Sequence, residues 1–218
     1  MLELLRKEIL SKTENFVQDK LKGDSGHDWW HIHRVRNTAL TLAKEEKADH
    51  FIVEIAALLH DIADHKFHNG DDSIGPKIAR EWLESLNIEE PQIQHICKII
   101  EGVSYKGADV ATPMTSIEGK VVQDADRLDA IGAIGIARAF SYGGFRNREL
   151  YNPEIPPVLH STFEAYKKDK GHTINHFYEK LFLLKDRMNT TSAKKMAQER
   201  HSFMEDYIHR FLGEWDGK

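Results

Sequence analysis

FIVEIAALLHDIA, the stretch from residue 51 to residue 63, carries an apolar side chain at nearly every position. A helix that is apolar on all sides is buried among other elements, so this stretch predicts a central helix. The segments around it place apolar residues three or four positions apart, as amphipathic helices do. The further predicted helices include residues 2–21, 73–86, 91–101, 116–126 and 129–140, and two stretches between about 160 and 214. Another predicted helix, after the loop of residues 22–26, has its inner stripe at Val35, Ala39, Leu42 and Ala43. Because no segment shows the alternating pattern of a half-buried strand, the predicted fold class is all-α.

The length of the chain, 218 residues, suits one domain, and no linker or internal repeat divides it. We therefore predict a single globular helical bundle over residues 1–218. Its core covers about 27–140, and C-terminal helices of about 160–214 pack on it. Ser73 and Ser116 are predicted helix caps, and Pro91 is a predicted first-turn residue. Residues 102–115 and 142–157 are predicted to lack regular structure.

The charge balance and the cysteine count exclude several classes of protein. Lys and Arg number 30 against 35 Asp and Glu, a net charge of −5, so nucleic acid is not a predicted partner. No apolar run is long enough to span a membrane, and the single cysteine, Cys97, fits a reducing compartment. We expect a soluble, cytoplasmic protein, and the choice between monomer and homodimer stays open. Seven of its 13 histidines fall between His27 and His68, and this cluster is the first place to look for chemistry.

Ionisable residues follow the apolar helix directly, in LLHDIADH, residues 58–65. Burying an unpaired charge costs several kcal/mol, so something must compensate these groups. His60 and Asp61 are about 100° apart on a helix and reach one common point off its flank, as two ligands of a metal ion do. Asp64 and His65 lie one turn further along. The alternative is a helix C-terminus at which His65 interacts with the helix dipole and both aspartates are solvated.

Two further segments carry residues of the same kind. In GHDWWHIHRV, residues 26–35, His31 precedes the core residue Val35 by one turn and therefore faces inward. In VVQDADRLDA, residues 121–130, three acids stand among apolar neighbours, and Asp126 is the candidate ligand among them. Four nearby residues are given structural roles instead. Asp129 is predicted to cap the next helix, and Arg138 is predicted to form an ion pair with an acid such as Asp129. Trp29 and Trp30 are predicted to pack in the core.

The ordered set of these pieces resembles the HD-domain metal-dependent phosphohydrolase superfamily. Its pattern is a His on one helix, an adjacent His-Asp on the next, and a distant Asp, which here match His31, His60-Asp61 and Asp126. The runs 58–72 and 123–139 are similar to the small bacterial HD proteins of the YpgQ and YedJ type, described as nucleotide pyrophosphohydrolases. The resemblance implies that these four residues bind a divalent metal. One ion is expected, because residues 99–106 lack the additional histidines of two-metal members. Two His nitrogens and two carboxylates suit Mn²⁺ or Mg²⁺ in function and Ni²⁺, Fe²⁺, Co²⁺ or Zn²⁺ in an isolated sample.

The resemblance also implies the reaction and the residues that carry it. A metal-activated water attacks phosphorus in a nucleoside or deoxynucleoside triphosphate, releasing a monophosphate and pyrophosphate. Asp64 and His65 are the candidate acid-base groups, and a partner that orients a ligand histidine is the alternative role of Asp64. The candidate residues that neutralise the phosphates are Arg127, Lys106 and Arg146. The alternative for each is that it is a surface cation with no role in binding substrate.

Two rival functions remain open. One is another HD reaction, either removal of phosphate from a nucleoside monophosphate or cleavage of a phosphodiester. The other is a non-catalytic nucleotide-sensing module in which the metal is structural.

Overall fold

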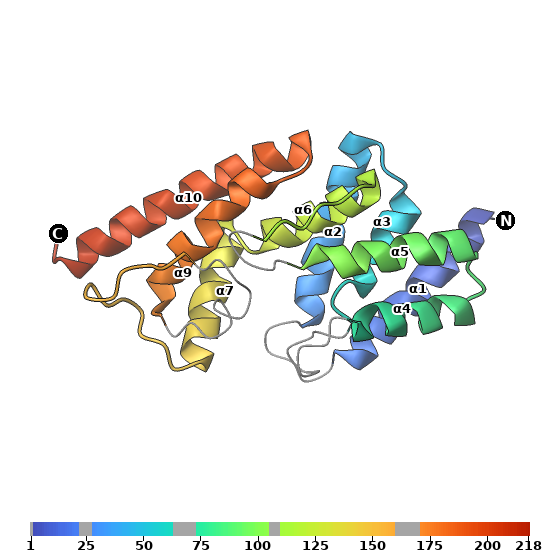
Figure 1. Cartoon of the computed structure of the whole chain (residues 1–218), viewed down its shortest axis with the longest axis horizontal. Coiled ribbons are helices and arrows are strands. Elements are labelled where there is room, and N and C mark those ends of the chain that lie inside the picture. Colours follow the sequence, from blue (N-terminus) through green and yellow to red (C-terminus); the bar gives the residue numbers. More distant parts are fainter. Residues whose placement is uncertain (1, 22–27, 63–72, 105–109, 160–170) are drawn as a thin grey trace. The chain divides into compact units, whose positions relative to one another are not determined.

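The computed structural model describes residues 2–21, 28–62, 73–104, 110–159 and 171–218, and every regular element within these ranges is helical. The prediction of an all-α fold is therefore confirmed. The chain divides into two compact units (Figure 1). Unit 1 comprises residues 1–104 and 112–126, and unit 2 comprises residues 105–111 and 127–218. No helix in the described part of the chain has both the length and the apolar character needed to cross a bilayer.

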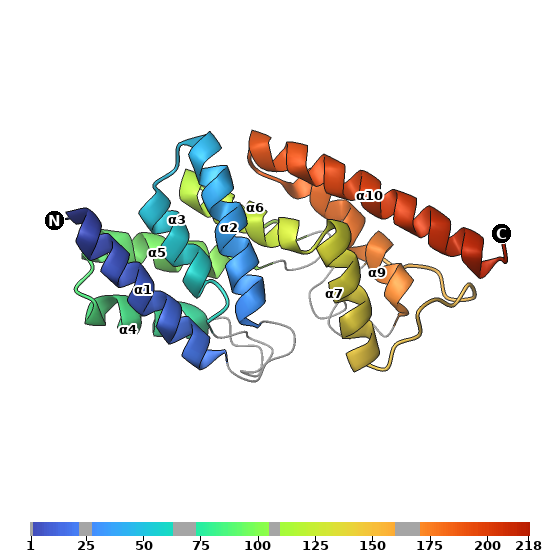
Figure 2. The same ribbon diagram turned by 180° about the vertical axis from the view of Figure 1, so that it is seen from behind.

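Unit 1 is built around the central helix α3. It contains α1 (Leu2–Lys20), α2 (Trp29–Glu46), α3 (His50–Leu59), α4 (Ile74–Ser85), α5 (Glu90–Val103) and most of α6 (Ile117–Asp129). Helices α1, α2 and α5 all contact α3, as Figure 2 shows from behind, and α4 packs on α5. Every residue of α3 from Phe51 to Leu59 is buried except Glu54, whose carboxylate accepts from Arg36 of α2. The prediction of a buried central helix is confirmed.

Helix α3 ends earlier than its apolar run predicts. The last helical residue is Leu59, and His60 is the C-cap, whereas the sequence predicted a helix to about residue 63. The Ile62 amide donates to the Leu59 carbonyl over three residues, which is the bond of a turn rather than of an α-helix. His60 and Asp61 therefore lie where the helix opens into a turn, and their side chains are not restricted to neighbouring positions of a helix.

The capping predictions are partly confirmed. The Ser116 hydroxyl accepts from the Gly119 amide at 3.1 Å, and Pro91 lies in the first turn of α5. Ser73 precedes α4 as predicted, although its side chain makes no capping bond to the helix.

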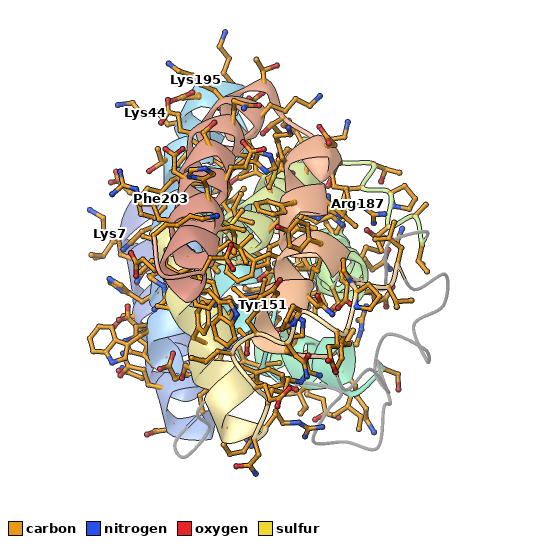
Figure 3. All side chains as sticks on the ribbon, turned by 90° about the vertical axis from the view of Figure 1, so that its left-hand side faces the viewer. Lys7, Lys44, Tyr151, Arg187, Lys195 and Phe203 are labelled. Carbon is orange, nitrogen blue, oxygen red and sulfur yellow. The ribbon has the colours of Figure 1, made fainter. Side chains whose placement is uncertain are left out.

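Unit 2 contains α7 (Gly132–Phe145), α9 (Thr173–Glu179), the 3₁₀ helix η2 (Leu181–Arg187) and the long α10 (Thr191–Trp215). Its core is aromatic. The Phe177 ring lies 6.1 Å from the Phe140 ring of α7 and 6.2 Å from the Tyr207 ring of α10. Phe203 of α10, labelled in Figure 3, is 51% exposed.

Two sequence predictions in unit 2 are wrong. Helix α7 continues to Phe145, five residues beyond the predicted end at Phe140. Its N-cap is Ile131, so Asp129 does not cap it; the Asp129 carboxylate instead pairs with Arg138 at 3.3 Å, as predicted for that arginine. The physical reason is the turn at residues 130–132, where Gly132 has a φ of 76° and separates α6 from α7.

Candidate metal centre

His31 is fixed in the first turn of α2 by the cap of that helix. The Asp28 carboxylate accepts from the His31 amide at 2.9 Å, which satisfies one of the free N–H groups at the helix start. One turn later Val35 is fully buried, and His31 on the same face is 2% exposed. The inward orientation predicted from the spacing of these two residues is confirmed.

The imidazole of His60 is oriented by its own helix. Its Nδ1 lies 2.8 Å from the Ala57 carbonyl oxygen, which can only accept, so Nδ1 carries the proton. In the neutral ring the Nε2 lone pair then points away from α3. Backbone carbonyls of this kind fix the tautomer of metal-binding histidines in many proteins.

Four side chains from three helix ends converge on one point of unit 1. Nε2 of His31 lies 3.2 Å from Nε2 of His60, 3.4 Å from Oδ2 of Asp61 and 3.5 Å from Oδ1 of Asp126. Nε2 of His60 lies 3.6 Å from Oδ2 of Asp61 and 3.8 Å from Oδ1 of Asp126. The histidines are buried, while the Asp61 and Asp126 side chains are 17% and 26% exposed, so the cluster opens toward solvent on its carboxylate side.

These spacings fit one divalent ion better than direct hydrogen bonds. Contacts of 3.5 Å and beyond are too long for strong N–H···O bonds. Ligand atoms about 2.1 Å from one ion stand about 3.4 Å apart in tetrahedral geometry and about 3.0 Å apart as octahedral neighbours. The observed 3.2 to 3.8 Å brackets the tetrahedral value. A donor set of imidazoles and carboxylates suits borderline divalent metals. The ligand atoms of His31, His60 and Asp126 all lie within 4.8 Å of one another and fit a resident metal ion. Asp61 Oδ2 lies near both histidine nitrogens and is a further candidate ligand.

The remaining predicted site residues are placed less completely. Asp64, His65 and Lys106 lie outside the described residues. Arg146 is exposed, whereas Arg127 is 5% exposed and its guanidinium donates to the Arg187 carbonyl within unit 2. The predicted contact of Arg127 with phosphate stays a prediction.

Neither of the two tryptophans beside His31 is fully buried, and Trp29 is of intermediate exposure. Trp30 is 60% exposed, and its ring stands edge-on to His33 at 5.8 Å. Its core assignment is wrong, because Trp30 lies about 100° around α2 from His31 and so off the buried face.

Gln123 is a residue of this region that sequence reasoning missed. It is fully buried on α6, one turn before Asp126, and its amide donates to the Gly102 carbonyl at 2.8 Å and to the Thr112 carbonyl at 3.0 Å. A single side chain thus ties the end of α5 and the segment before α6 to the helix that carries a metal ligand. The sequence feature that could have indicated a buried Gln123 is its position directly after the apolar pair Val121-Val122.

Comparison with known proteins identifies the class. A family model of the HD domain matches residues 29–131, which include all four converging side chains. The chain belongs to the HD-domain superfamily, and it is a hydrolase of that superfamily. Its relatives include Bacillus subtilis YpgQ, 40% identical over 199 residues that span 89% of this chain and 88% of that protein.

Solved structures extend the similarity to nearly the whole chain. An HD-superfamily hydrolase from Bacillus thuringiensis is 45% identical, with a TM-score of 0.78, over 98% of this chain and 100% of that one. Bacillus subtilis YpgQ in complex with ADP is 37% identical, with a TM-score of 0.77, over 96% of each chain. The expectation of an HD phosphohydrolase fold drawn from the sequence is confirmed.

Proposed function

We propose that this protein is a metal-dependent nucleotide pyrophosphohydrolase that cleaves nucleoside or deoxynucleoside triphosphates between the α and β phosphates. The observation that carries the proposal is the convergence of His31, His60, Asp61 and Asp126 within 3.2 to 3.8 Å of the histidine nitrogens. The nucleotide as substrate class is supported by the YpgQ structure, which contains ADP.

The residues of the site have separate tasks in this proposal. A bound divalent cation, Mn²⁺ or Mg²⁺ in the cell, would lower the pKa of water and neutralise negative charge on the phosphate. His31 and His60 would hold it from the buried side, with the Ala57 carbonyl keeping the His60 ring in one tautomer. Asp61 and Asp126 would complete the set from the partly exposed side, which would leave the reacting phosphate access.

Other residues are proposed to move protons and neutralise phosphate. Asp64 and His65 follow the ligand pair in sequence and are proposed to transfer the protons of the attacking water and the leaving group. Arg127, Lys106 and Arg146 are proposed to neutralise the phosphates. The single cysteine, Cys97, is free and buried, which suits an enzyme that works in the reducing cytoplasm.

A product assay tests the proposal. The purified protein is incubated with ATP, dATP, AMP and a cyclic mononucleotide, each with Mn²⁺, Mg²⁺, Co²⁺ or Ni²⁺, and pyrophosphate and orthophosphate are measured separately. We expect equimolar monophosphate and pyrophosphate from the triphosphates. Orthophosphate from AMP would instead support a monophosphatase, ring opening would support a phosphodiesterase, and absence of turnover with metal bound would support a sensing module.

The role of Asp64 is tested by one isosteric change. Asp64→Asn is expected to lower kcat about 10²- to 10⁴-fold and to leave the bound metal in place, because it removes an acid-base group and no ligand. Elemental analysis accompanies the kinetics. Normal kcat combined with weakened metal binding would show that Asp64 orients a ligand instead.

A further inference from the structure

Helices α2 and α3 form an antiparallel hairpin that brings two of the candidate metal ligands together at its open end. The two helices contact each other within unit 1 (Figure 2), and residues 47–49 join them. The Ala48 amide donates to the Ala43 carbonyl at 3.1 Å, which fixes this join. His31 lies at the other end of α2, about 22 Å along the helix from its last residue, Glu46. The join therefore holds the helices together at the end far from His31 and His60.

A metal centre at the open end tolerates little sliding of α2 along α3. Nε2 of His31 and Nε2 of His60 stand 3.2 Å apart, and a metal site requires its ligand distances to within about 0.2 Å. A shift of one residue along a helix axis is about 1.5 Å, several times that tolerance. The alignment of the two helices along their axes, here called their register, must therefore be well defined near His31 and His60.

The apolar stripe of α2 defines this register only loosely. Beyond His31 and Ile32, the buried residues of α2 are all apolar: Val35, Ala39, Leu42 and Ala43. Apolar burial is non-directional and roughly proportional to the area removed from water. The stripe thus stabilises the hairpin, but it specifies the register less sharply than a hydrogen bond between the two helices would.

Arg36 of α2 and Glu54 of α3 make such a directional contact. Nε of Arg36 donates to Oε1 of Glu54 at 2.8 Å, and Nη2 donates to the same oxygen. Nη1 of Arg36 donates to Oε2 of Glu14 on α1 at 3.0 Å, so the guanidinium is bonded on two sides. The side chains of Arg36 and Glu54 are only 20% and 13% exposed, which limits screening of the pair by salt. Hydrogen bonds between charged groups are about twice as strong as neutral ones.

This ion pair lies close to the metal centre in the hairpin. Arg36 comes five residues after His31 on α2, and Glu54 comes six residues before His60 on α3. These steps correspond to about 7.5 Å and 9 Å along the two helices, roughly one and a half turns. Because the steps are nearly equal, a slide that separates the two histidines also breaks the bond between Arg36 and Glu54.

We propose that Arg36 and Glu54 are positioning residues of the metal centre, whose bond fixes the register of α2 on α3 and with it the separation of His31 and His60. Selecting one alignment of packed helices is the best-attested role of buried polar contacts. The inference rests on the metal binding of the proposed function, and it is independent of the nucleotide and of the bond cleaved. Neither residue is a metal ligand in this role.

Two substitutions of Glu54 test the inference by calorimetric titration with Mn²⁺ alone. Glu54→Met and Glu54→Gln remove the same charge, but glutamine keeps an oxygen that accepts from Arg36 and methionine does not. Glu54→Met is expected to weaken Mn²⁺ binding about 10-fold, the lower end of the effect of residues that orient metal ligands. Glu54→Gln should stay within about 3-fold of the wild type, because a neutral acceptor keeps part of the bond. Arg36 keeps its bond to Glu14 in both variants, so both are expected to fold.

Arg36→Met separates the register from simple electrostatics. It removes a positive charge, which by Coulomb attraction alone would strengthen the binding of a cation. The positioning role predicts the opposite, a weakening similar to that in Glu54→Met. The visible absorption of bound Co²⁺ depends on the arrangement of its ligands, so it should change in both methionine variants and match the wild type in Glu54→Gln.

Leu83→Ala on α4 is the control for loss of stability. Leu83 is fully buried in unit 1 and belongs to neither helix of the hairpin, so the change destabilises the unit without altering the register. It should leave both the Mn²⁺ affinity and the Co²⁺ spectrum unchanged. The inference is overturned if either methionine variant binds Mn²⁺ as tightly as the wild type, if Glu54→Gln binds as weakly as Glu54→Met, or if Leu83→Ala weakens binding equally.

Product formation by the wild type separates this inference from the proposed function. Triphosphate hydrolysis combined with equal Mn²⁺ affinity in all variants refutes only the positioning role. Weakened Mn²⁺ binding in both methionine variants, without triphosphate hydrolysis by the wild type, refutes only the pyrophosphohydrolase.

Discussion

Gln123 is expected to hold together the part of unit 1 from which Asp126 projects, and Gln123→Met tests this. Methionine has nearly the length and volume of glutamine but cannot donate, so the change removes the bonds to the Gly102 and Thr112 carbonyls with little change of packing. Each carbonyl left without a partner costs about 1 to 3 kcal/mol. Both bonds are only partly buried, so the lower end applies to each, and the expected loss of unfolding free energy is about 2 to 4 kcal/mol. For a chain of this length that lowers Tm by about 4 to 16 °C.

Urea unfolding followed by tryptophan fluorescence measures this loss in the correct unit. Three of the four tryptophans lie in unit 1, so a Trp215→Phe background removes the signal of unit 2. Gln94→Met is the matched control: Gln94 is exposed on α5, and its amide donates only to Glu90, at 2.9 Å, among the bonds described. It should cost less than about 0.5 kcal/mol. An equal effect of the two substitutions would refute the argument that the paired carbonyl bonds stabilise unit 1.

Three further predictions concern the metal, a buried arginine and pH. Asp126→Ala should contain no bound Mn²⁺ in elemental analysis. It should also lack the stabilisation of about 2.7 kcal/mol in unfolding free energy that metal at 100 times its Kd gives the wild type. Asp206→Ala, which changes an exposed acid of α10, should keep the metal and the stabilisation, and full metal occupancy in Asp126→Ala would contradict the ligand assignment. Arg127→Ala should lower unfolding free energy by about 1.5 to 3 kcal/mol, because the charged bond to the Arg187 carbonyl is lost, and an unchanged Tm would disprove that role. Burial lowers the pKa of His176 from 6.5 to about 3, so the unfolded chain takes up its proton first as pH falls. Stability from this group is complete above pH 6.5 and is lost toward pH 3, by at most about 1.4 kcal/mol per pH unit. Denaturant titrations at a series of pH values should show that His176→Gln loses less unfolding free energy than the wild type as the pH falls. Parallel losses in the two proteins would contradict this role of His176.

Periodicity predicted the helices well where one face of each is buried. The stripe of α2 and the apolar run of α3 are both buried as expected. The ends of helices were predicted less well, because a boundary depends on one or two hydrogen bonds and not on a summed pattern. The turn bond of Ile62 ends α3 early, and the capping bonds of Arg148 and Asn147 end α7 only after Phe145, past the predicted stop. A single apolar residue also misled, since Trp30 is exposed although the sequence predicted it in the core.

The sequence by itself determined the helical class and the identity of the four candidate ligands. Spacing along one helix suffices to aim His31 inward, and an ordered set of His, His-Asp and Asp is uncommon enough to mark a superfamily. Only the tertiary structure decided that these side chains meet at 3.2 to 3.8 Å, that a carbonyl fixes the His60 tautomer, and that Gln123 joins segments about ten and twenty residues away. It also decided that Arg127 is buried against a carbonyl of unit 2 while Arg146 borders a cavity. The physical reason is that distances between helices, and the choice of which long cation is buried, depend on packing between segments far apart in the chain, which local periodicity does not encode.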